Sequence, residues 1–172
     1  MRPLDPAGPE LTHGRWRLLR ARAHREMPVA PAVAWAVISD HTTWTTWQAD
    51  YRTHEAETPD SSGIGARFRT VEWVFHHRSE IVRWEPPVAL GWTIVEAGSL
   101  AWLLSRYYSE LVVEPVAGDP DSCVVRAQVA FSGTWLFWLL GAYTVGQSLA
   151  TVTSDTRSSL RALERLVVEA AD

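Results

Sequence analysis

The stretch VGQSLATVTSDTRSSLRALERLV, residues 145–167, decides the fold of this 172-residue chain. Its apolar and small side chains recur every three or four residues, which is the spacing of one face of an α-helix. The positions on this stripe are Val145, Leu149, Val152, Thr156, Leu160, Leu163 and Val167. A long amphipathic helix of this kind needs an apolar surface to cover, so the preceding residues must supply one.

The residues before this helix are typical of strands separated by turns. Trp16–Val29 alternates like a strand, and Ala32–Ser39 is expected to form a short helix. Asp40 can cap a second short helix, in which Trp44 and Trp47 lie one turn apart and pack against the sheet. Six further strands are expected at residues 50–58, 66–73, 75–85, 89–97, 105–115 and 122–132.

This order of elements predicts an α+β domain with a curved, antiparallel sheet of about seven strands wrapped around the long C-terminal helix. Two short helices follow the first strand. A bent sheet that grips one helix leaves a space suited to a ligand. Residues 1–14, which contain prolines and glycines, are expected to form a flexible tail, and residues 15–172 a single domain.

Composition excludes several classes of function. The net charge is −4 and all 16 basic residues are arginine, so we expect no binding to nucleic acid and no lysine Schiff base. A lone cysteine, Cys123, excludes an internal disulfide and is expected to be a small core residue. The sequence contains no phosphate loop, dinucleotide fingerprint or nucleophile elbow, so no cofactor is expected.

Two further features bear on metal binding and location. His76 and His77 are adjacent on an expected strand and point to opposite faces, so no metal site is expected there. The uncharged stretch Ala127–Ser154 is interrupted by glycines and begins with strand-like alternation, so we do not expect it to span a membrane. Met1–Glu10 has no apolar run and does not resemble a secretory signal, which favours a cytoplasmic protein.

Four segments carry a resemblance to a known superfamily. They are VAPAVAWAVISDHTTWTTW (Val29–Trp47), GIGARFR (Gly63–Arg69), VRWEPPVALGW (Val82–Trp92) and CVVRAQVAFSG (Cys123–Gly133). In order and spacing they resemble the SRPBCC superfamily, also called START-like or helix-grip proteins, and within it the polyketide cyclase/dehydrase-like branch. The resemblance covers roughly residues 20–170 and implies the helix-grip fold. Members include aromatase/cyclases, lipid and hormone carriers, coenzyme Q-binding proteins and self-resistance proteins, so the fold alone does not choose a function.

Strand alternation suggests which charged residues face the pocket. Arg83 and Glu85 are typical of a solvated face, so the alternating residues Val82 and Trp84 are expected to point inward. The same alternation places Arg78 and Glu80 on the inward side. An inward Arg78 would steady a ligand enolate, while Glu80 or His76 would move protons. The alternative for Arg78 and Glu80 is an ion pair at the end of the sheet or in solvent.

Aromatic and hydroxyl side chains are the expected ligand contacts. They are Trp73, Trp84, Trp92, Trp102, Tyr107, Trp135, Trp138, Thr153 and Thr156. Several belong to three apolar connections, near residues 73–76, 98–105 and 133–144, that an up-and-down order of strands brings to one end. We expect this apolar patch to frame the mouth of the pocket. A homodimer interface is an alternative, and contact with a membrane ranks below both because the chain lacks lysine and carries net negative charge.

These features predict a protein that binds a bulky hydrophobic small molecule, aromatic or polycyclic, in an internal cavity. As an enzyme it would cyclise and dehydrate a polyketide-like substrate, with the cavity fixing the reactive conformer. The alternatives are a non-catalytic carrier or sequestering protein, and an accessory domain that binds a partner through the apolar patch.

Overall fold

A computed structural model describes residues 19–72, 75–99, 104–134, 136 and 142–171. The elements run in the expected order. They are strand β1 (Leu19–Met27), helix α1 (Pro31–Ser39), the 3-10 helix η2 (His41–Thr43), helix α2 (Trp44–Trp47), strands β2 (Thr53–Ala56), β3 (Arg67–Val71), β4 (Phe75–Glu85), β5 (Ala89–Ser99), β6 (Leu104–Val116) and β7 (Asp119–Gly133), and helix α4 (Ala142–Ala171). The tail expected at residues 1–14 lies outside the described residues.

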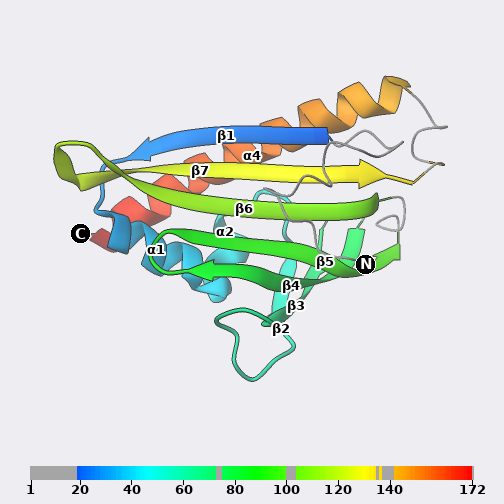
Figure 1. Cartoon of the computed structure of the whole chain (residues 1–172), viewed down its shortest axis with the longest axis horizontal. Coiled ribbons are helices and arrows are strands. Elements are labelled where there is room, and N and C mark those ends of the chain that lie inside the picture. The colour runs from blue at the N-terminus through cyan, green and yellow to red at the C-terminus, as the bar shows by residue number, and fades with distance from the viewer. Residues whose placement is uncertain (1–18, 73–74, 100–103, 135, 137–141, 172) are drawn as a thin grey trace.

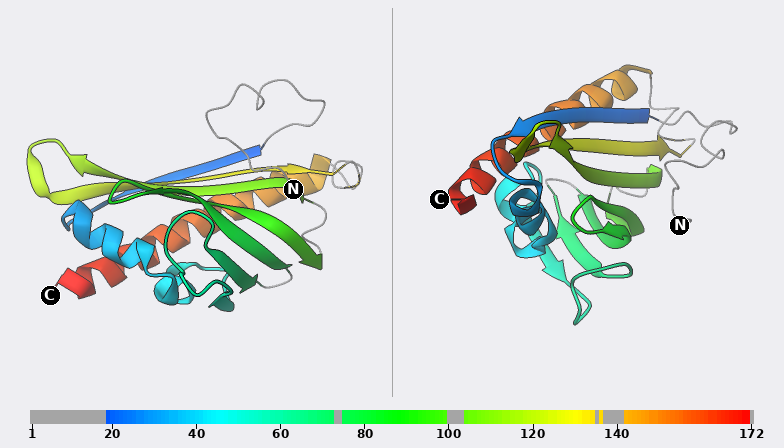
Figure 2. Two further views of the ribbon diagram at one scale, coloured as in Figure 1. Left: turned by 60° about the horizontal axis from the view of Figure 1, so that its bottom comes forward. Right: turned by 60° about the vertical axis from the view of Figure 1, so that its left-hand side comes forward.

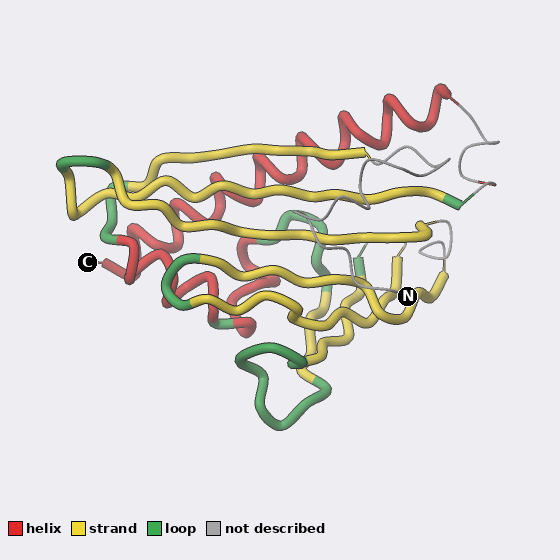
Figure 3. The backbone as a smooth tube through the Cα atoms, in the orientation of Figure 1, coloured by secondary structure: helices red, strands yellow, loops and turns green. Residues whose placement is uncertain are grey.

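The seven strands form one antiparallel sheet in the order β1-β7-β6-β5-β4-β3-β2. Helix α4 runs across one face of this sheet, and the short helices lie on the same side (Figures 1 and 2). We call this face the inner face and the opposite one the outer face. The loop of residues 57–66, between β2 and β3, extends away from the body of the sheet (Figure 3). The predicted α+β helix-grip architecture is confirmed.

The short helices begin where their sequence predicts. Pro31 occupies the first turn of α1, where its missing N–H costs no hydrogen bond. The Asp40 carboxylate caps η2 by accepting a hydrogen bond from the Thr42 backbone N–H at 2.9 Å. Trp44 and Trp47 are each only 1% exposed, and the Trp44 indole N–H donates to the Ile38 carbonyl at 2.9 Å. Both rings therefore belong to the core, as predicted.

Two apolar clusters pack α4 against the sheet at different positions along the helix. In the larger one, Leu160, Leu163 and Val167 of α4 pack with residues of α1, α2 and β3–β7. All three are buried, and each fully buried aliphatic side chain contributes about 1.5–3 kcal/mol. In the smaller cluster, the half-buried Val152 packs beside Ala21, Val129 and Phe131. The C-terminal half of α4 is thus closely covered, whereas residues 152–156 keep partial exposure.

A β-bulge in β4 reverses the alternation on which the inward prediction for Arg78 and Glu80 depended. Ile81 pairs with Trp92, and Arg83 pairs with Gly91, so Val82 is an extra residue. Trp84 consequently faces inward, as predicted, but the inward residues before the bulge are His77, Ser79 and Ile81, all buried. The prediction that Arg78 and Glu80 face inward is therefore wrong.

Both charged residues form ion pairs at the surface instead. Arg78 pairs with Glu57 at 2.8 Å and with Glu96 at 2.6 Å, and its side chain is 46% exposed. Glu80 pairs with Arg67 at 2.8 Å. This arrangement is the solvated ion-pair alternative that the sequence left open.

Three strand ends meet where the apolar connections were expected. Val71 of β3 pairs with His76 of β4, Phe75 pairs with Ser99 of β5, and Gly133 ends β7 beside Leu104. The connections that follow Val71, Ser99 and Gly133 therefore leave the sheet at the same end. Trp73, Trp102, Trp135 and Trp138 lie outside the described residues, so their contact with a ligand stays a prediction. Across the described segments, no helix combines the length and apolar character needed to cross a bilayer.

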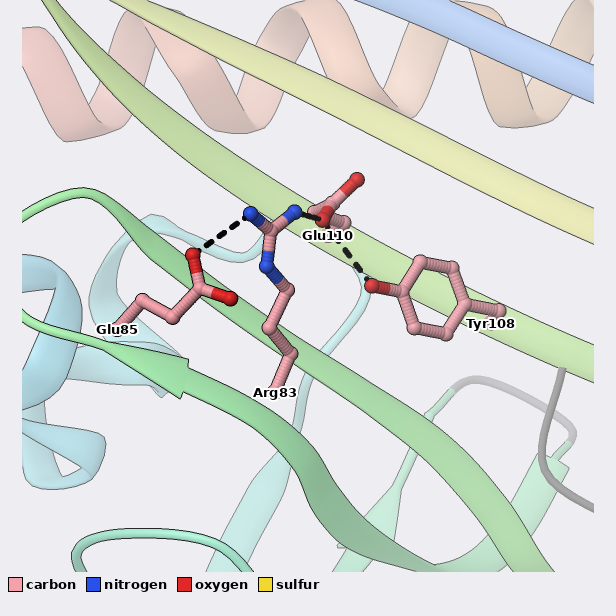
Figure 4. A network of polar contacts seen from close by, with 4 residues as sticks. All are labelled: Arg83, Glu85, Tyr108 and Glu110. Carbon is pink, nitrogen blue, oxygen red and sulfur yellow. Dashed lines mark hydrogen bonds and ion pairs between the residues drawn. The ribbon is translucent and has the colours of Figure 1, made fainter. Parts of the chain in front are cut away.

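A polar network covers the bulge on the outer face (Figure 4). Arg83 binds Glu110 and also Glu85, the latter at 2.8 Å, and the Tyr108 hydroxyl donates to Glu110 at 3.1 Å. Tyr108 lies directly over Gly91, where an added Cβ would come within 2.5 Å of the Tyr108 Oη. Gly91 is therefore required by the close approach of this ring.

We predict that Gly91→Ala lowers the free energy of unfolding by about 1–3 kcal/mol, the usual cost of overpacking. Chemical denaturation measures this change. The double variant Gly91→Ala/Tyr108→Phe should lose less than the sum of the single changes, because it removes the clashing hydroxyl. A neutral Gly91→Ala, or strictly additive effects, would contradict the contact.

Candidate functional site

A hydrogen bond from the loop after α2 to α4 brings two carboxyl groups together. The Ala49 backbone N–H donates to the Ser159 Oγ at 3.0 Å. Asp155 lies one helical turn before Ser159 and on the same face of α4. Asp50, which follows Ala49, is thereby placed against Asp155, and the two side chains share a hydrogen bond.

The same loop is tied to β3, which brings a third carboxyl group to the site. The Arg52 backbone N–H donates to the Val71 carbonyl at 2.8 Å, so Tyr51 lies beside the end of β3. Glu72 follows β3 directly and continues the inward alternation of Phe68 and Thr70. The three carboxyls therefore come from the loop, the sheet and the helix.

Aromatic side chains of the inner face surround these carboxyls. The Trp92 indole N–H lies beside the Tyr51 hydroxyl without the geometry of a full hydrogen bond, and the Tyr107 hydroxyl interacts with Ser109. Burial is the main cause of the raised pKa of both Tyr51 and Tyr107, yet both side chains are partly exposed. Both rings therefore lie deep among protein atoms and keep part of their surface accessible.

Burial disfavours ionisation of all three carboxyls, and repulsion between neighbouring carboxyls adds to this effect at Asp50 and Glu72. Burial, reinforced by the negative charges of Asp50 and Asp155, raises the pKa of Glu72 from 4.5 to about 7. The pKa of Asp50 is raised by burial and by Asp155, and that of Asp155 is raised by burial. Near neutral pH the site thus holds carboxyls in both protonation states, a property typical of functional sites.

The histidines that face this region are neutral. Burial lowers the pKa of His77 to about 4, and its Nδ1 lies 3.9 Å from Glu72 Oε1. Burial also lowers the pKa of His54 to about 3; its ring stacks against both Trp44 and Phe68, with centroid distances of 4.8 and 4.7 Å. Neither histidine therefore neutralises the carboxyls at pH 7.

Four polar atoms on the inner face of the described strands have no hydrogen-bond partner: His54 Nε2, His77 Nδ1, Ser79 Oγ and Trp92 Nε1. His77 and Ser79 are only 5% and 1% exposed. Buried polar groups are nearly always paired, and an unpaired one costs about 1–3 kcal/mol. Such unpaired polar atoms on the inner face are the expected contacts of a bound molecule.

The structure brings together only some of the residues predicted for the site. Trp92 lies beside Tyr51, and Tyr107 lies near Glu72 and Asp50; their contact with a ligand stays a prediction. Trp84 instead packs edge-on against Trp35 of α1, with the ring centroids 5.4 Å apart. Among the other predicted residues that the structure describes, Thr153 and Thr156 are half-buried on α4, and the Thr156 hydroxyl donates to the Val152 carbonyl at 2.6 Å. His76, like Arg78, is exposed.

Sequence reasoning missed five residues of the site: Asp50, Tyr51, Glu72, His77 and Asp155. A signal for Glu72 was present, because Ala66, Phe68 and Thr70 alternate with arginines and project the same face onto position 72. Within the described residues, no three His, Cys, Asp or Glu side chains are arranged to hold a metal ion.

Comparison with known proteins identifies the family. The sequence profile of the family described as polyketide cyclase / dehydrase and lipid transport matches residues 19–167. A search of curated proteins finds no match. The chain belongs to this polyketide cyclase-like family of the START-like, or SRPBCC, superfamily. Family and fold support a protein that binds a hydrophobic small molecule.

Solved structures share the fold at low sequence identity. Norcoclaurine synthase from Thalictrum flavum, as a point mutant with a transition-state analogue, is 15% identical, with 93% of this chain and 100% of that chain covered and a TM-score of 0.70. The protein TTHA0849 from Thermus thermophilus is 19% identical, with 89% and 99% covered and a TM-score of 0.70. A START superfamily protein from Mycobacterium smegmatis is 12% identical, with 88% and 98% covered and a TM-score of 0.66. At these identities the likeness establishes the fold alone.

We predict that Glu72→Gln stabilises the unliganded protein at pH 8 by about 1–3 kcal/mol and has a much smaller effect at pH 5. The folded-state pKa of Glu72 lies above its unfolded value, so its contribution to stability is present below pH 4.5 and lost as pH rises through about 7. The variant cannot ionise and escapes this loss.

Denaturant unfolding at the two pH values measures the difference. Glu55→Gln removes the same charge from an exposed position on β2 and serves as the control. A Glu72→Gln effect equal at both pH values, or equal to that of Glu55→Gln, would contradict the burial of an ionisable Glu72.

Proposed function

We propose that the protein binds one bulky aromatic or polycyclic molecule between the inner face of the sheet and residues 152–156 of α4. The observation that carries this proposal is the position of Tyr51 and Tyr107, which are deep among protein atoms yet partly exposed. The rings of Trp92, Tyr51 and Tyr107 provide flat apolar walls, which favour flat apolar ligands.

The uneven cover of the inner face supports the same place for the ligand. Leu160 and Leu163 fill the interior beside the C-terminal half of α4, whereas Thr156 and Val152 remain half-buried one and two turns earlier in the helix. A ligand beside Val152 and Thr156 would cover these side chains, and each Å² of apolar surface removed from water contributes about 25 cal/mol.

Proton transfer is a second candidate activity, favoured by the pKa of Glu72. A group with a pKa of about 7 both accepts and releases protons at neutral pH, which suits the cyclisation and dehydration of a polyketide-like substrate. Glu72 takes this role in place of Arg78, Glu80 and His76, whose exposed or ion-paired positions give no access to the interior. A carrier or sequestering protein would show the same affinity without forming product.

Fluorescence titration with the apolar probe N-phenyl-1-naphthylamine tests the proposed binding. We expect saturable binding of one probe per chain with quenching of tryptophan emission. Thr156→Trp should weaken binding about tenfold or more, because the larger ring fills the space from the helix.

Ser158→Trp adds the same ring at an exposed position of α4 and should leave binding unchanged. Equal effects of the two substitutions would place the probe elsewhere on the protein. Non-saturable binding to the unmodified protein would remove the proposal.

A further inference from the structure

We propose that the molecule bound at this site carries a cationic amine, held among the carboxyls of Asp50, Glu72 and Asp155. This inference rests on the proposed function, because it requires a ligand in the same space. It adds the chemical class of the ligand's polar group, which an apolar, aromatic-walled space alone does not specify.

The charges around the site leave a cation as the missing partner. Each carboxyl has a pKa raised by burial, and Asp50 and Glu72 are raised further by the neighbouring carboxyls. Among the described residues, no positive charge contributes to the pKa of any of the three, and the chain contains no lysine. The uncharged groups that face the site from β2, β4 and β6 are His54, His77 and Tyr107.

Unpaired, deeply buried polar side chains point to the same place independently of the carboxyls. The His77 side chain is 3% exposed, and its Nδ1 faces Glu72 at 3.9 Å, too far for a hydrogen bond and without another partner. The Trp92 indole N–H, on a residue 3% exposed, is directed toward the Tyr51 hydroxyl without a full hydrogen bond. The neutral His77 ring can accept a hydrogen bond at Nδ1 from an ammonium group beside Glu72, whereas the Trp92 N–H, which only donates, would need an acceptor elsewhere on the ligand.

The surrounding rings are also suited to a cation. Tyr51 and Tyr107 lie near the carboxyls, and a cation over an aromatic ring gains about 0.5–2 kcal/mol. An ammonium group donates up to three hydrogen bonds, which matches an array of carboxylate acceptors. An anionic group at the same position would meet three acids in a poorly solvated interior.

The pH dependence of binding follows from the ionisation of Glu72. An alkylamine keeps its proton to about pH 10, so it stays cationic across the range in which Glu72 ionises. His54 and His77 stay neutral above pH 5 and contribute no change. Amine affinity is therefore expected to rise between pH 6 and pH 8, with release of protons from the site on binding at pH 7.

Calorimetric titration with three probes of one shape tests the inference. The probes are naphthylethylamine, naphthylethanol and naphthylacetate, which are cationic, neutral and anionic at pH 8. We expect the amine to bind at least about tenfold more tightly than the alcohol, and the carboxylate to bind most weakly.

A double variant tests the placement. Glu72→Gln/Asp155→Asn should bring the amine and alcohol affinities within about threefold of each other. Glu55→Gln, which removes an exposed charge, should preserve the preference for the amine. Thermal unfolding of each variant verifies that it is folded.

The outcomes separate the inference from the proposed function. Equal binding of amine and alcohol by the unmodified protein would overturn the cationic ligand and leave the hydrophobic site intact. A preference for the amine that survives in the double variant would overturn the assignment to these carboxyls. Binding of none of the three probes would overturn both.

Discussion

A single helix must cover the inner face of a seven-stranded sheet, and this constraint shapes the rest of the molecule. Helix α4 covers the sheet fully only where its Leu160, Leu163 and Val167 belong to the main core. Toward the other end, Val152 reaches only a small apolar cluster. The interior between these two regions is where polar side chains from the sheet, the α2–β2 loop and the helix converge.

That convergence carries a cost in stability which the ligand is proposed to offset. Asp50, Glu72 and Asp155 all have raised pKa values, and His77 is buried without a partner for its Nδ1. The hydrogen bonds of Ala49 to Ser159 and of Arg52 to Val71 hold the loop that carries Asp50 against α4 and β3. Binding energy is gained where the free protein leaves charges and polar atoms poorly satisfied.

Local patterns predicted the elements well, because helix and strand periods and turn residues act over short stretches. They failed at the bulge: one extra residue, Val82, reverses the alternation and moves Arg78 and Glu80 to the surface. A bulge depends on the register with the partner strand, here the pairing of Ile81 with Trp92 and of Arg83 with Gly91 of β5, which no local pattern in β4 encodes. Likewise, Asp155 enters the site only because Ser159 binds the backbone of a distant loop.

The most direct test is a carbon-13 NMR titration of the Glu72 carboxyl in the free protein and in the presence of naphthylethylamine. Burial among acids predicts a pKa of about 7 in the free protein, and a bound ammonium group should lower it by at least one unit. A pKa near the ordinary 4.5 in the free protein, unchanged by the amine, would contradict an acidic, ligand-binding interior.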